Sequence, residues 1–322
     1  MRAPHFQAQL WRLAGDTDIF PYVSLTQQRG MCLLVPPLPE QCAIACILGA
    51  LDDKIELNRK TNETLEAMAR ALFQSWFVDF DPVRAKMEGR QPEGMDAETA
   101  RLFPSSFEDS ELGAIPSGWT CLPLDSWVSA LSGGTPAKGD PSLWNGGIPW
   151  VSPKSMTSIH ADEAEDFVTE AAIGNGTRLA PQGATLIMVR GMGLHQKVRI
   201  GQAVVDVAFN QDVKALVPNA IDESLLLFAM LHAQAGLLTK VETSGHGTGK
   251  LASEILLAHP ITMPSATTQR HLALPFARTS RIIALARDES RTLTALRDAL
   301  LPKLLSGELR VPEAERAVSK VL

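Results

Sequence analysis

The stretch PPLPEQCAIACILGALDDKIELNRKTNETLEAMARALFQSWF, at residues 36–77, decides the fold. Mostly apolar side chains recur in it at alternating steps of four and three residues, which is the spacing of a coiled-coil seam. The seam positions are Ile44, Leu48, Leu51, Ile55, Asn58, Asn62, Leu65, Ala69, Leu72 and Trp76. A single helix from about Glu40 to Phe77 would be roughly 57 Å long at about 1.5 Å per residue, which is long for a packed core. We therefore predict an extended helix that pairs with another helix.

A second, diverged copy of this segment supplies the partner. Residues 41–77 align with residues 269–305 at a constant offset of 228, without a gap and with ten identities in 37 positions. Alanine- and leucine-rich helices match partly by chance, so the gap-free register is the stronger evidence. We expect the two copies to pair antiparallel within one chain, because each then buries the seam of the other. The residues assigned to this pairing are Leu48, Leu51, Ile55, Asn58, Asn62, Leu65, Leu72, Ile283, Leu293 and Leu300.

Polar residues and prolines interrupt both copies. Asn58 and Asn62 stand at seam positions, where they either select the register through buried hydrogen bonds or face solvent where the seam opens. The second copy has Thr279, Ser290 and Arg297 at seam positions. It also contains Pro275 and Pro302, which should limit or kink the helix because proline lacks an amide donor. We expect the second helix to be the weaker one in isolation.

A mixed domain separates the two copies. The segment 81–117 is rich in charge, Gly and Pro and predicts an irregular connector. From Gly118 to about Pro260, strands are predicted at 185–190, 203–208 and 213–217, and the helix 223–241 is apolar on nearly every side, which predicts burial. The predicted fold class is α+β, with one mixed α/β domain flanked by two long helices that form an antiparallel coiled coil.

Composition and motifs exclude several functions. Four cysteines and seven histidines show no disulfide framework, zinc pattern or HExxH motif, so we expect no metal site. No apolar run approaches the about 20 residues that span a bilayer, and the start lacks a signal-peptide core, so we expect a cytoplasmic protein without membrane contact. We also find no nucleophile elbow, no methyltransferase catalytic loop and no carboxylate pair suited to acid–base work, and we assign no catalytic residue.

The glycine-rich sequence SGHGTGK at residues 244–250 resembles a phosphate-binding loop only in part. Ser244 stands where a glycine is required, and Leu251 follows Lys250 where a hydroxyl would bind magnesium. We therefore do not expect nucleotide hydrolysis. The alternative interpretation, in which this loop contacts a DNA phosphate, is left open.

Basic residues concentrate in one segment of an acidic chain. The net charge is −6, which argues against general coating of nucleic acid, yet residues 171–205 contain four Lys or Arg and no acidic residue. Arginine there could pair with guanine and lysine with phosphate, or the charges could simply protect a solvated sheet edge. Asn210 and Gln211 could read adenine or be turn residues. The candidate DNA-binding residues are Lys154, Arg178, Arg190, Lys197, Arg199, Asn210, Gln211 and Lys250.

The sequence resembles a known family, the specificity subunits of type I restriction-modification enzymes. PPLPEQ at 36–41 and LGALDDKIELNRKTNETLEAMARALFQSWFVDFDPVRAK at 48–86 are similar to its central conserved region. The segments similar to a target-recognition domain are IPSGWT (115–120), GGTP (133–136), IPWVSPKSM (148–156), FNQDVKALVP (209–218) and GTGK (247–250). The helix at 269–305 and LLSGEL at 304–309 resemble the distal conserved region.

The resemblance implies a division of the chain into six parts. These are a remnant of a first target-recognition domain (1–35), the central conserved helix (36–80), a connector (81–110), a target-recognition domain (111–260), the distal conserved helix (261–310) and a tail (311–322). Only about 35 residues precede PPLPEQ, and TDIFPYVSLTQQRGMCLLV at 17–35 looks like the end of a recognition domain. MPSATTQRH at 263–271 keeps the glutamine of PPLPEQ but not its double proline.

The resemblance also implies partners. Double-stranded DNA, two methyltransferase subunits and a restriction subunit are expected, with S-adenosylmethionine, ATP and Mg in the partner subunits and no cofactor in this chain. The leading hypothesis is a non-catalytic DNA-recognition subunit that directs these partners to a split DNA site. The alternative is a helical scaffold or degenerate fragment that no longer reads DNA. Two copies of the chain could also form a symmetric homodimer.

Overall fold

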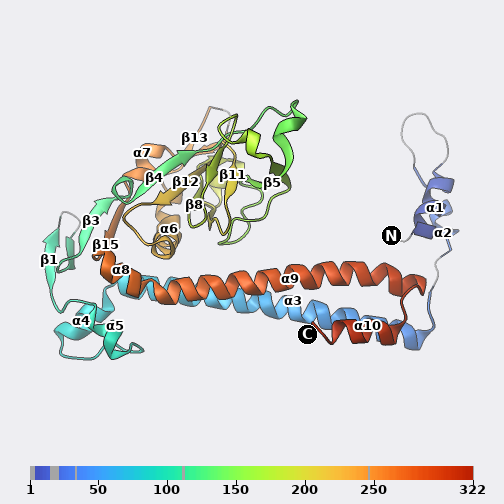
Figure 1. Cartoon of the computed structure of the whole chain (residues 1–322), viewed down its shortest axis with the longest axis horizontal. Coiled ribbons are helices and arrows are strands. Elements are labelled where there is room, and N and C mark those ends of the chain that lie inside the picture. Colours follow the sequence, from blue (N-terminus) through green and yellow to red (C-terminus); the bar gives the residue numbers. More distant parts are fainter. Residues whose placement is uncertain (1–3, 15–21, 33–34, 111–112, 246, 322) are drawn as a thin grey trace. The chain divides into compact units, whose positions relative to one another are not determined.

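The computed structural model describes residues 4–14, 22–32, 35–110, 113–245 and 247–321 (Figure 1). These residues form two compact units, one from Met1–Thr64 with Ile282–Leu322 and one from Leu65–Arg281. Of the segment predicted as a domain remnant, residues 1–3, 15–21 and 33–34 lie outside the described residues. The described part forms two short helices, α1 (Pro4–Leu13) and α2 (Leu25–Arg29).

Two long helices confirm the predicted pairing. Helix α3 (Leu38–Phe73) and helix α9 (Leu274–Ser306) begin in one unit and end in the other. In the first unit they run antiparallel, because Asn62 approaches Ile283 while Asp52 near the start of α3 pairs with Arg297 near the end of α9. Pro275 lies in the first turn of α9, and Pro302 lies inside its last turns without ending the helix.

The seam of the first unit is buried as the repeat predicted. Ile44, Ile47 and Leu51 of α3 pack in one apolar cluster with Leu293, Leu300 and Leu304 of α9. The last helix, α10 (Val311–Val318), adds Ala314 and Val318 to this cluster. The segment 311–322, predicted as a tail, therefore contains an amphipathic helix that covers the end of the seam.

Asn58 is buried in the seam and makes hydrogen bonds across it, as one of the two alternatives for the seam asparagines predicted. It is 6% exposed, and its Nδ2 donates to the carbonyl oxygen of Ala286 at 3.3 Å, to Glu289 Oε2 at 2.7 Å and to Ser290 Oγ at 3.2 Å. Asn62 is half-buried; its Nδ2 lies 3.5 Å from the Ile283 carbonyl oxygen, while its Oδ1 is buried without a hydrogen-bond partner. The hydrogen-bonded alternative thus holds for Asn58 and only weakly for Asn62.

The pairing follows the sequence repeat. Asn58 donates to Ala286, and these two residues are separated by 228 positions, which is the offset of the repeat. Because the helices are antiparallel, equivalent residues of the two copies lie at similar distances on opposite sides of this point. Within the first unit, residues 54–64 and 282–292 are therefore related by an approximate two-fold axis near Asn58 and Ala286.

The second unit begins with an aromatic core. Helix α3 ends in one π-helical turn, η1 (Gln74–Val78), that buries Trp76 and Phe77. Their rings pack around Phe276 of α9, with centroid separations of 6.0 Å and 6.1 Å. Phe80 then adopts the left-handed conformation with φ 55°, which reverses the chain. The further aromatic members of this core are Phe73, Phe103, Trp119 and Phe228.

The segment predicted as an irregular connector is largely ordered structure. It forms helices α4 (Asp81–Met87) and α5 (Ala97–Arg101) and a hairpin of β1 (Phe107–Ser110) and β2 (Gly113–Pro116). Lys86 Nζ donates to the carbonyl oxygens of Ala100 and Phe103, which ties the two helices together. The Gly and Pro content marked turns here, but buried Val83 and Phe103 make the segment part of the core.

Two four-stranded sheets form the body of the mixed domain. One has the order β10 (Ile200–Gln202), β8 (Thr185–Met188), β12 (Val213–Pro218), β4 (Val128–Ser132), and all its pairs are antiparallel. The other has the order β6 (Asp166–Val168), β5 (Trp144–Val151), β11 (Val207–Phe209), β7 (Arg178–Ala180), with β5 and β11 parallel. The predicted strand 203–208 is confirmed only at its end, since β11 begins at Val207.

Three smaller elements complete the domain. Strands β13 (Glu242–Thr243), β14 (Gly249–Lys250) and β9 (Arg190–Gly191) form a three-stranded sheet in the order β13–β14–β9. Strand β15 (Pro260–Met263) pairs with β3 (Thr120–Pro123), and helix α7 (Ser253–Leu257) precedes it. Helix α6 (Glu223–Leu238) buries ten of its residues, as its apolar sequence predicted.

A glutamine joins the mixed domain to its helices. Gln269 in helix α8 (Ala266–Leu272) is 2% exposed; its Oε1 accepts from the amide of Asp222, and its Nε2 donates to the carbonyl oxygens of Ala220 and Pro264. Its repeat equivalent, Gln41, donates to the carbonyl oxygen of Pro36, which is the equivalent of Pro264. The two copies therefore share the bond from glutamine to the proline carbonyl oxygen. Only the glutamine of the second copy makes further bonds, to Ala220 and Asp222 of the mixed domain.

Candidate nucleic-acid interface

Strand register brings several loops to one end of the mixed domain. In the first sheet, β4 ends at Ser132 opposite Lys214, and β8 ends at Met188 opposite Val213, where β12 begins. In the second sheet, β5 and β11 end together at Val151 and Phe209, opposite the start of β7 at Arg178. The turn 210–212 connects β11 directly to β12, so both sheets end on the same side. We call the loops 133–139, 152–155, 174–177, 189–199 and 210–212 the loop end.

Two glycines allow these loops to pack closely. A Cβ atom at Gly133 would lie 2.3 Å from the carbonyl oxygen of Phe209, and one at Gly134 would lie 2.2 Å from the carbonyl oxygen of Gly176. Only glycine fits such backbone approaches. Trp150 Nε1 also donates to the Gly134 carbonyl oxygen at 3.1 Å. The GGTP sequence therefore holds the loop 133–139 against the ends of β11 and β7.

Six predicted basic residues gather at this end. Lys154 follows β5, Arg178 opens β7, and Arg190 follows β8, while Lys197 and Arg199 precede β10. Lys250 joins them because β14 pairs with β9, with Lys250 opposite Arg190. These residues come from separate parts of the sequence, and the fold places them together. Their contact with DNA stays a prediction.

Not all of these cations are equally available. The Lys154 ammonium pairs with the Glu165 carboxylate at 2.7 Å, which offsets its charge. Arg199 Nη1 donates to the carbonyl oxygen of Pro153 at 2.6 Å and so anchors the loop 152–155. Arg190 and Lys250 are exposed, although Glu242 stands opposite Lys250 on the other neighbouring strand. Arg190 and Lys250 are therefore the clearest candidates for phosphate or base contacts.

The two predicted amide side chains differ in accessibility. Asn210 is 7% exposed, and its Oδ1 accepts from the amide of Asp212 at 3.0 Å, which favours the turn role over adenine reading. Gln211 is exposed, and its Oε1 accepts from the Thr135 hydroxyl at 2.7 Å. This bond engages the side-chain oxygen of Gln211 and not its side-chain nitrogen.

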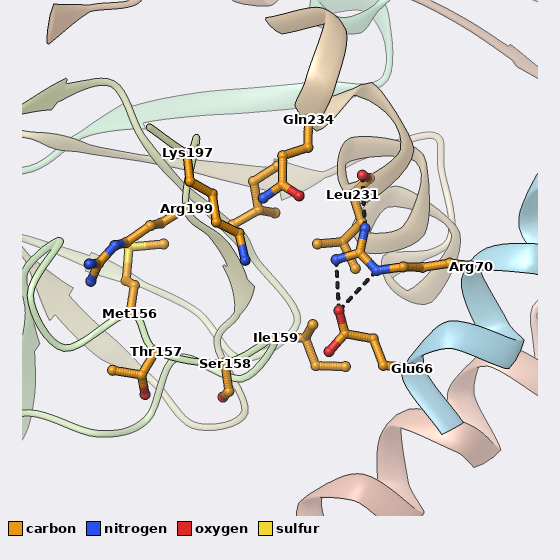
Figure 2. A pocket seen from close by; sticks show the side chains of 11 residues that line it. Glu66, Arg70, Met156, Thr157, Ser158, Ile159, Lys197, Arg199, Leu231 and Gln234 are labelled. Atoms are coloured by element: carbon orange, nitrogen blue, oxygen red, sulfur yellow. Dashed lines mark hydrogen bonds and ion pairs between the residues drawn. The ribbon is translucent and has the colours of Figure 1, made fainter. Parts of the chain in front are cut away.

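A small hollow lies beside Lys197 and Arg199 (Figure 2). The Lys197 ammonium points into it, opposite Ile159 and Ser158. On the far side the Arg70 guanidinium pairs with Glu66 at 2.7 Å and donates to the Leu231 carbonyl oxygen at 3.0 Å. Because Arg70 pairs with Glu66 and Arg199 donates to the Pro153 carbonyl oxygen, Lys197 is the clearest cation that the hollow offers to an anion.

Sequence reasoning missed two lysines at the loop end. Lys138 is exposed in the loop after β4, and Lys214 Nζ donates to Ser132 Oγ at 3.0 Å. Both belong to segments already quoted for the family resemblance or next to them, so a search for cations flanking GGTP and FNQDV would have found them. Register alone shows that they lie at the same end as Arg190.

The glycine-rich sequence 244–250 does not have the arrangement of a phosphate-binding loop. It connects β13 to β14, and Lys250 lies on a strand rather than at the start of a helix. Among the described residues no group of three His, Cys, Asp or Glu side chains could hold a metal ion, and no described helix has the length and apolar character to cross a membrane.

The fold and the site together define a class of protein: a mixed α/β domain with a basic loop end, and an antiparallel pair of long helices. Comparisons with known proteins agree with this class. The chain is 26% identical to the Type I restriction enzyme HindI specificity subunit of Haemophilus influenzae, over 90% of this chain and 72% of that protein. It is 27% identical to the Type I restriction enzyme MjaIX specificity subunit of Methanocaldococcus jannaschii, over 91% of this chain and 64% of that protein.

A shorter match and one solved structure add to this picture. The Escherichia coli EcoR124I/EcoR124II specificity subunit is 31% identical over 44% of this chain and 35% of its own length. The crystal structure of the type I restriction-modification system S subunit from M. genitalium shares the fold, with a TM-score of 0.57 at 16% identity, over 93% of this chain and 70% of that one. No protein-family model matches the chain. The resemblance to type I specificity subunits seen in the sequence is thus confirmed.

Proposed function

We propose that this chain is a DNA-recognition subunit of a type I restriction-modification system and directs a methyltransferase to its target sequence. The observation that carries the proposal is the loop end, where Arg190, Lys250, Lys138 and Gln211 are brought together from separate loops. Exposed cations bind phosphates and position a protein on the duplex, whereas amide and guanidinium groups can read base edges. The specificity-subunit relatives support the same role.

The proposal assigns catalysis to partner subunits. S-adenosylmethionine, ATP and Mg would bind there, in keeping with the lack of methyltransferase or nucleotide-binding motifs in this sequence. This chain would recognise the target sequence and hold the partner subunits near it. A split target and a restriction subunit belong to the same proposal.

The two-fold symmetry of the helices supports two equivalent partner sites. Leu57 and Leu285 occupy equivalent repeat positions and are 57% and 60% exposed. Both are in the first unit, on opposite sides of the axis near Asn58 and Ala286. Exposed apolar residues in symmetry-related positions can bind two copies of one partner, so we propose that each leucine contributes to a methyltransferase site.

Methylome mapping tests the proposed function. The chain is co-expressed with the methyltransferase encoded beside it, the complex is purified, and methylated adenines are mapped in the host genome. A single recurring motif that vanishes when this chain is omitted is the expected result. Absence of both a complex and a motif would refute the proposal, and a complex without a motif would favour the helical scaffold.

Salt dependence tests the loop end directly. The affinity of the complex for a duplex carrying the mapped motif should fall as salt rises, because phosphate contacts release counterions. Arg190→Ala should reduce the slope of log K against log salt by about 1 if Arg190 binds one phosphate. Arg101→Ala, which removes an exposed arginine from helix α5, is the matched control and should leave the slope unchanged. An unchanged slope in Arg190→Ala would remove this residue from the interface.

A further inference from the structure

One exposed apolar side chain stands among the cations of the loop end. Met192 is 69% exposed, the highest value for a large apolar residue among the described residues 107–263. It lies two positions after Arg190, and the strand that carries Arg190 pairs with the strand that carries Lys250. Isolated exposed apolar residues are common on protein surfaces. This one calls for an explanation because it directly follows strand β9, in which Arg190 is paired with Lys250 of β14.

The backbone around Met192 is held rigidly. Gly191 pairs with Gly249 and has φ 134°, and a Cβ atom there would lie 2.7 Å from Met188 Cε. Leu194 is fully buried, and Gly249 packs so closely on it that an added Cβ would lie 3.1 Å from Leu194 Cβ. The short helix Met192–His195 is therefore anchored by its buried Leu194, whereas Met192 is exposed to solvent.

A hydrogen bond braces the same element from the side. The His195 Nε2 atom lies 3.0 Å from the carbonyl oxygen of Gly247, in the connection between β13 and β14. The amide of Arg190 also donates to the carbonyl oxygen of Asp212 at 3.3 Å, which ties β9 to the turn 210–212. Presenting Met192 on this support costs little further ordering when a partner binds, since its backbone is already fixed.

The chemistry of the surroundings indicates what Met192 would touch. Arg190 and Lys250 attract a polyanion, and they lie on paired neighbouring strands at the loop end, where side chains can reach the major groove of a bound duplex. A thioether side chain makes no strong hydrogen bond, so it cannot read the polar edge of a base. The apolar group that base edges offer in the major groove is the C5-methyl group of thymine.

We infer that Met192 is a specificity-determining residue that packs against the methyl group of one thymine in the target, while Arg190 and Lys250 on the adjoining strands contact phosphates. The inference rests on the proposed function and deepens it. It assigns a role to a residue that hydrogen-bond reasoning about recognition overlooks. Affinity for non-target DNA should depend on the two cations and not on Met192.

Replacing thymine by deoxyuridine isolates the methyl group. The wild-type complex with the methyltransferase is titrated against duplexes of the mapped motif in which each thymine in turn is replaced by deoxyuridine. One replacement should weaken binding about fourfold to tenfold, the size expected for one buried methyl contact. Met192→Ala should weaken binding to the unmodified duplex by the same factor and should be insensitive to that replacement.

Two further variants separate this contact from general effects. Val205→Ala removes an exposed apolar residue from the turn between β10 and β11, which lies at the opposite end of the strands, and should behave like the wild type. Met192→Leu should retain the discrimination. A Met192→Ala complex that still distinguishes thymine from deoxyuridine at that position, or a wild type that tolerates every replacement, would overturn the inference while leaving the proposed function intact. Absence of any mapped motif would defeat both.

Discussion

At the scale of single residues, the two seam asparagines have opposite effects on the stability of the helix pair. Asn58 uses its amide group for three contacts across the seam. The Oδ1 atom of Asn62 is buried without a partner, and its amide group makes one contact at the outer limit of 3.5 Å. A buried polar atom without a partner costs about 1–3 kcal/mol, so Asn62 lowers the free energy of unfolding.

Asn62→Leu should therefore raise the free energy of unfolding by about 1–2 kcal/mol, because it removes this penalty and extends the apolar seam. Asn58→Leu should lower it by about 1–3 kcal/mol, since Glu289 and Ser290 lose their buried donor. Urea unfolding of the full chain, followed by circular dichroism, compares both variants with the wild type. Equal destabilisation by the two substitutions would show that Asn62 is satisfied in solution.

Two histidines of the second unit should make its stability depend on pH. Burial lowers the pKa of His259 below its ordinary value of 6.5, with the nearby charges of Lys240 and His232 adding to the effect. Burial also lowers the pKa of His232, against a smaller opposing influence of Asp79. The unfolded chain then binds more protons than the folded one below about pH 6.5, so protonation favours unfolding.

The stability of the second unit should be complete above about pH 6.5 and should decline as the pH falls from there through the lowered pKa of each folded-state histidine. His259→Gln should flatten this decline in part, and the double variant with His232→Gln should flatten it further. Melting temperatures measured over about 3 pH units around the ordinary histidine pKa test this expectation. His271→Gln, the same substitution at an exposed position, is the matched control variant.

At the scale of elements, the repeat offers a matched pair of glutamines. Gln269→Ala removes three hydrogen bonds and leaves the half-buried amide of Asp222 without this acceptor, so it should lower the free energy of unfolding by about 2–3 kcal/mol. Gln41→Ala removes one exposed bond to the Pro36 carbonyl oxygen and should change it by less than about 0.5 kcal/mol. Denaturant midpoints measure both. Similar losses in the two variants would mean that the local bond, rather than the link to Ala220 and Asp222, is what matters.

Periodicity predicted the long elements well, and it failed where tertiary packing decides. The helix expected from about Glu40 to Phe77 is α3 followed by one π-helical turn, since seven-residue spacing depends only on which face is buried. The segment 81–117 was wrongly predicted to be irregular, because Phe103 is buried by distant aromatic partners that local composition does not reveal. For the same reason the sequence could name Arg190 and Lys250 as candidates but not as neighbours, a relation that strand register creates.

At the scale of the whole molecule, the uneven distribution of charge is consistent with the proposed DNA recognition and not with general coating of DNA. The chain carries −6 overall, and the run 171–205 carries four cations and no carboxylate. Like charges on DNA and protein repel, so productive approach favours orientations that present the loop end. Affinity for DNA should therefore be modest for the chain alone and should rise when partner subunits add contacts.

The approximate two-fold axis leads to a prediction about stoichiometry. If Leu57 and Leu285 mark two equivalent sites, Leu57→Glu or Leu285→Glu alone should remove one methyltransferase subunit from the complex, because a carboxylate at the centre of an apolar contact is costly to bury. The double variant should lose both subunits. Met87→Glu, which alters another exposed apolar residue on helix α4, should retain full assembly. Native mass spectrometry counts the subunits directly and also reveals any homodimer of this chain. Full assembly of the double variant would show that the partners bind elsewhere, whereas loss of both subunits in each single variant would show that they depend on one another rather than on two independent, symmetry-related sites.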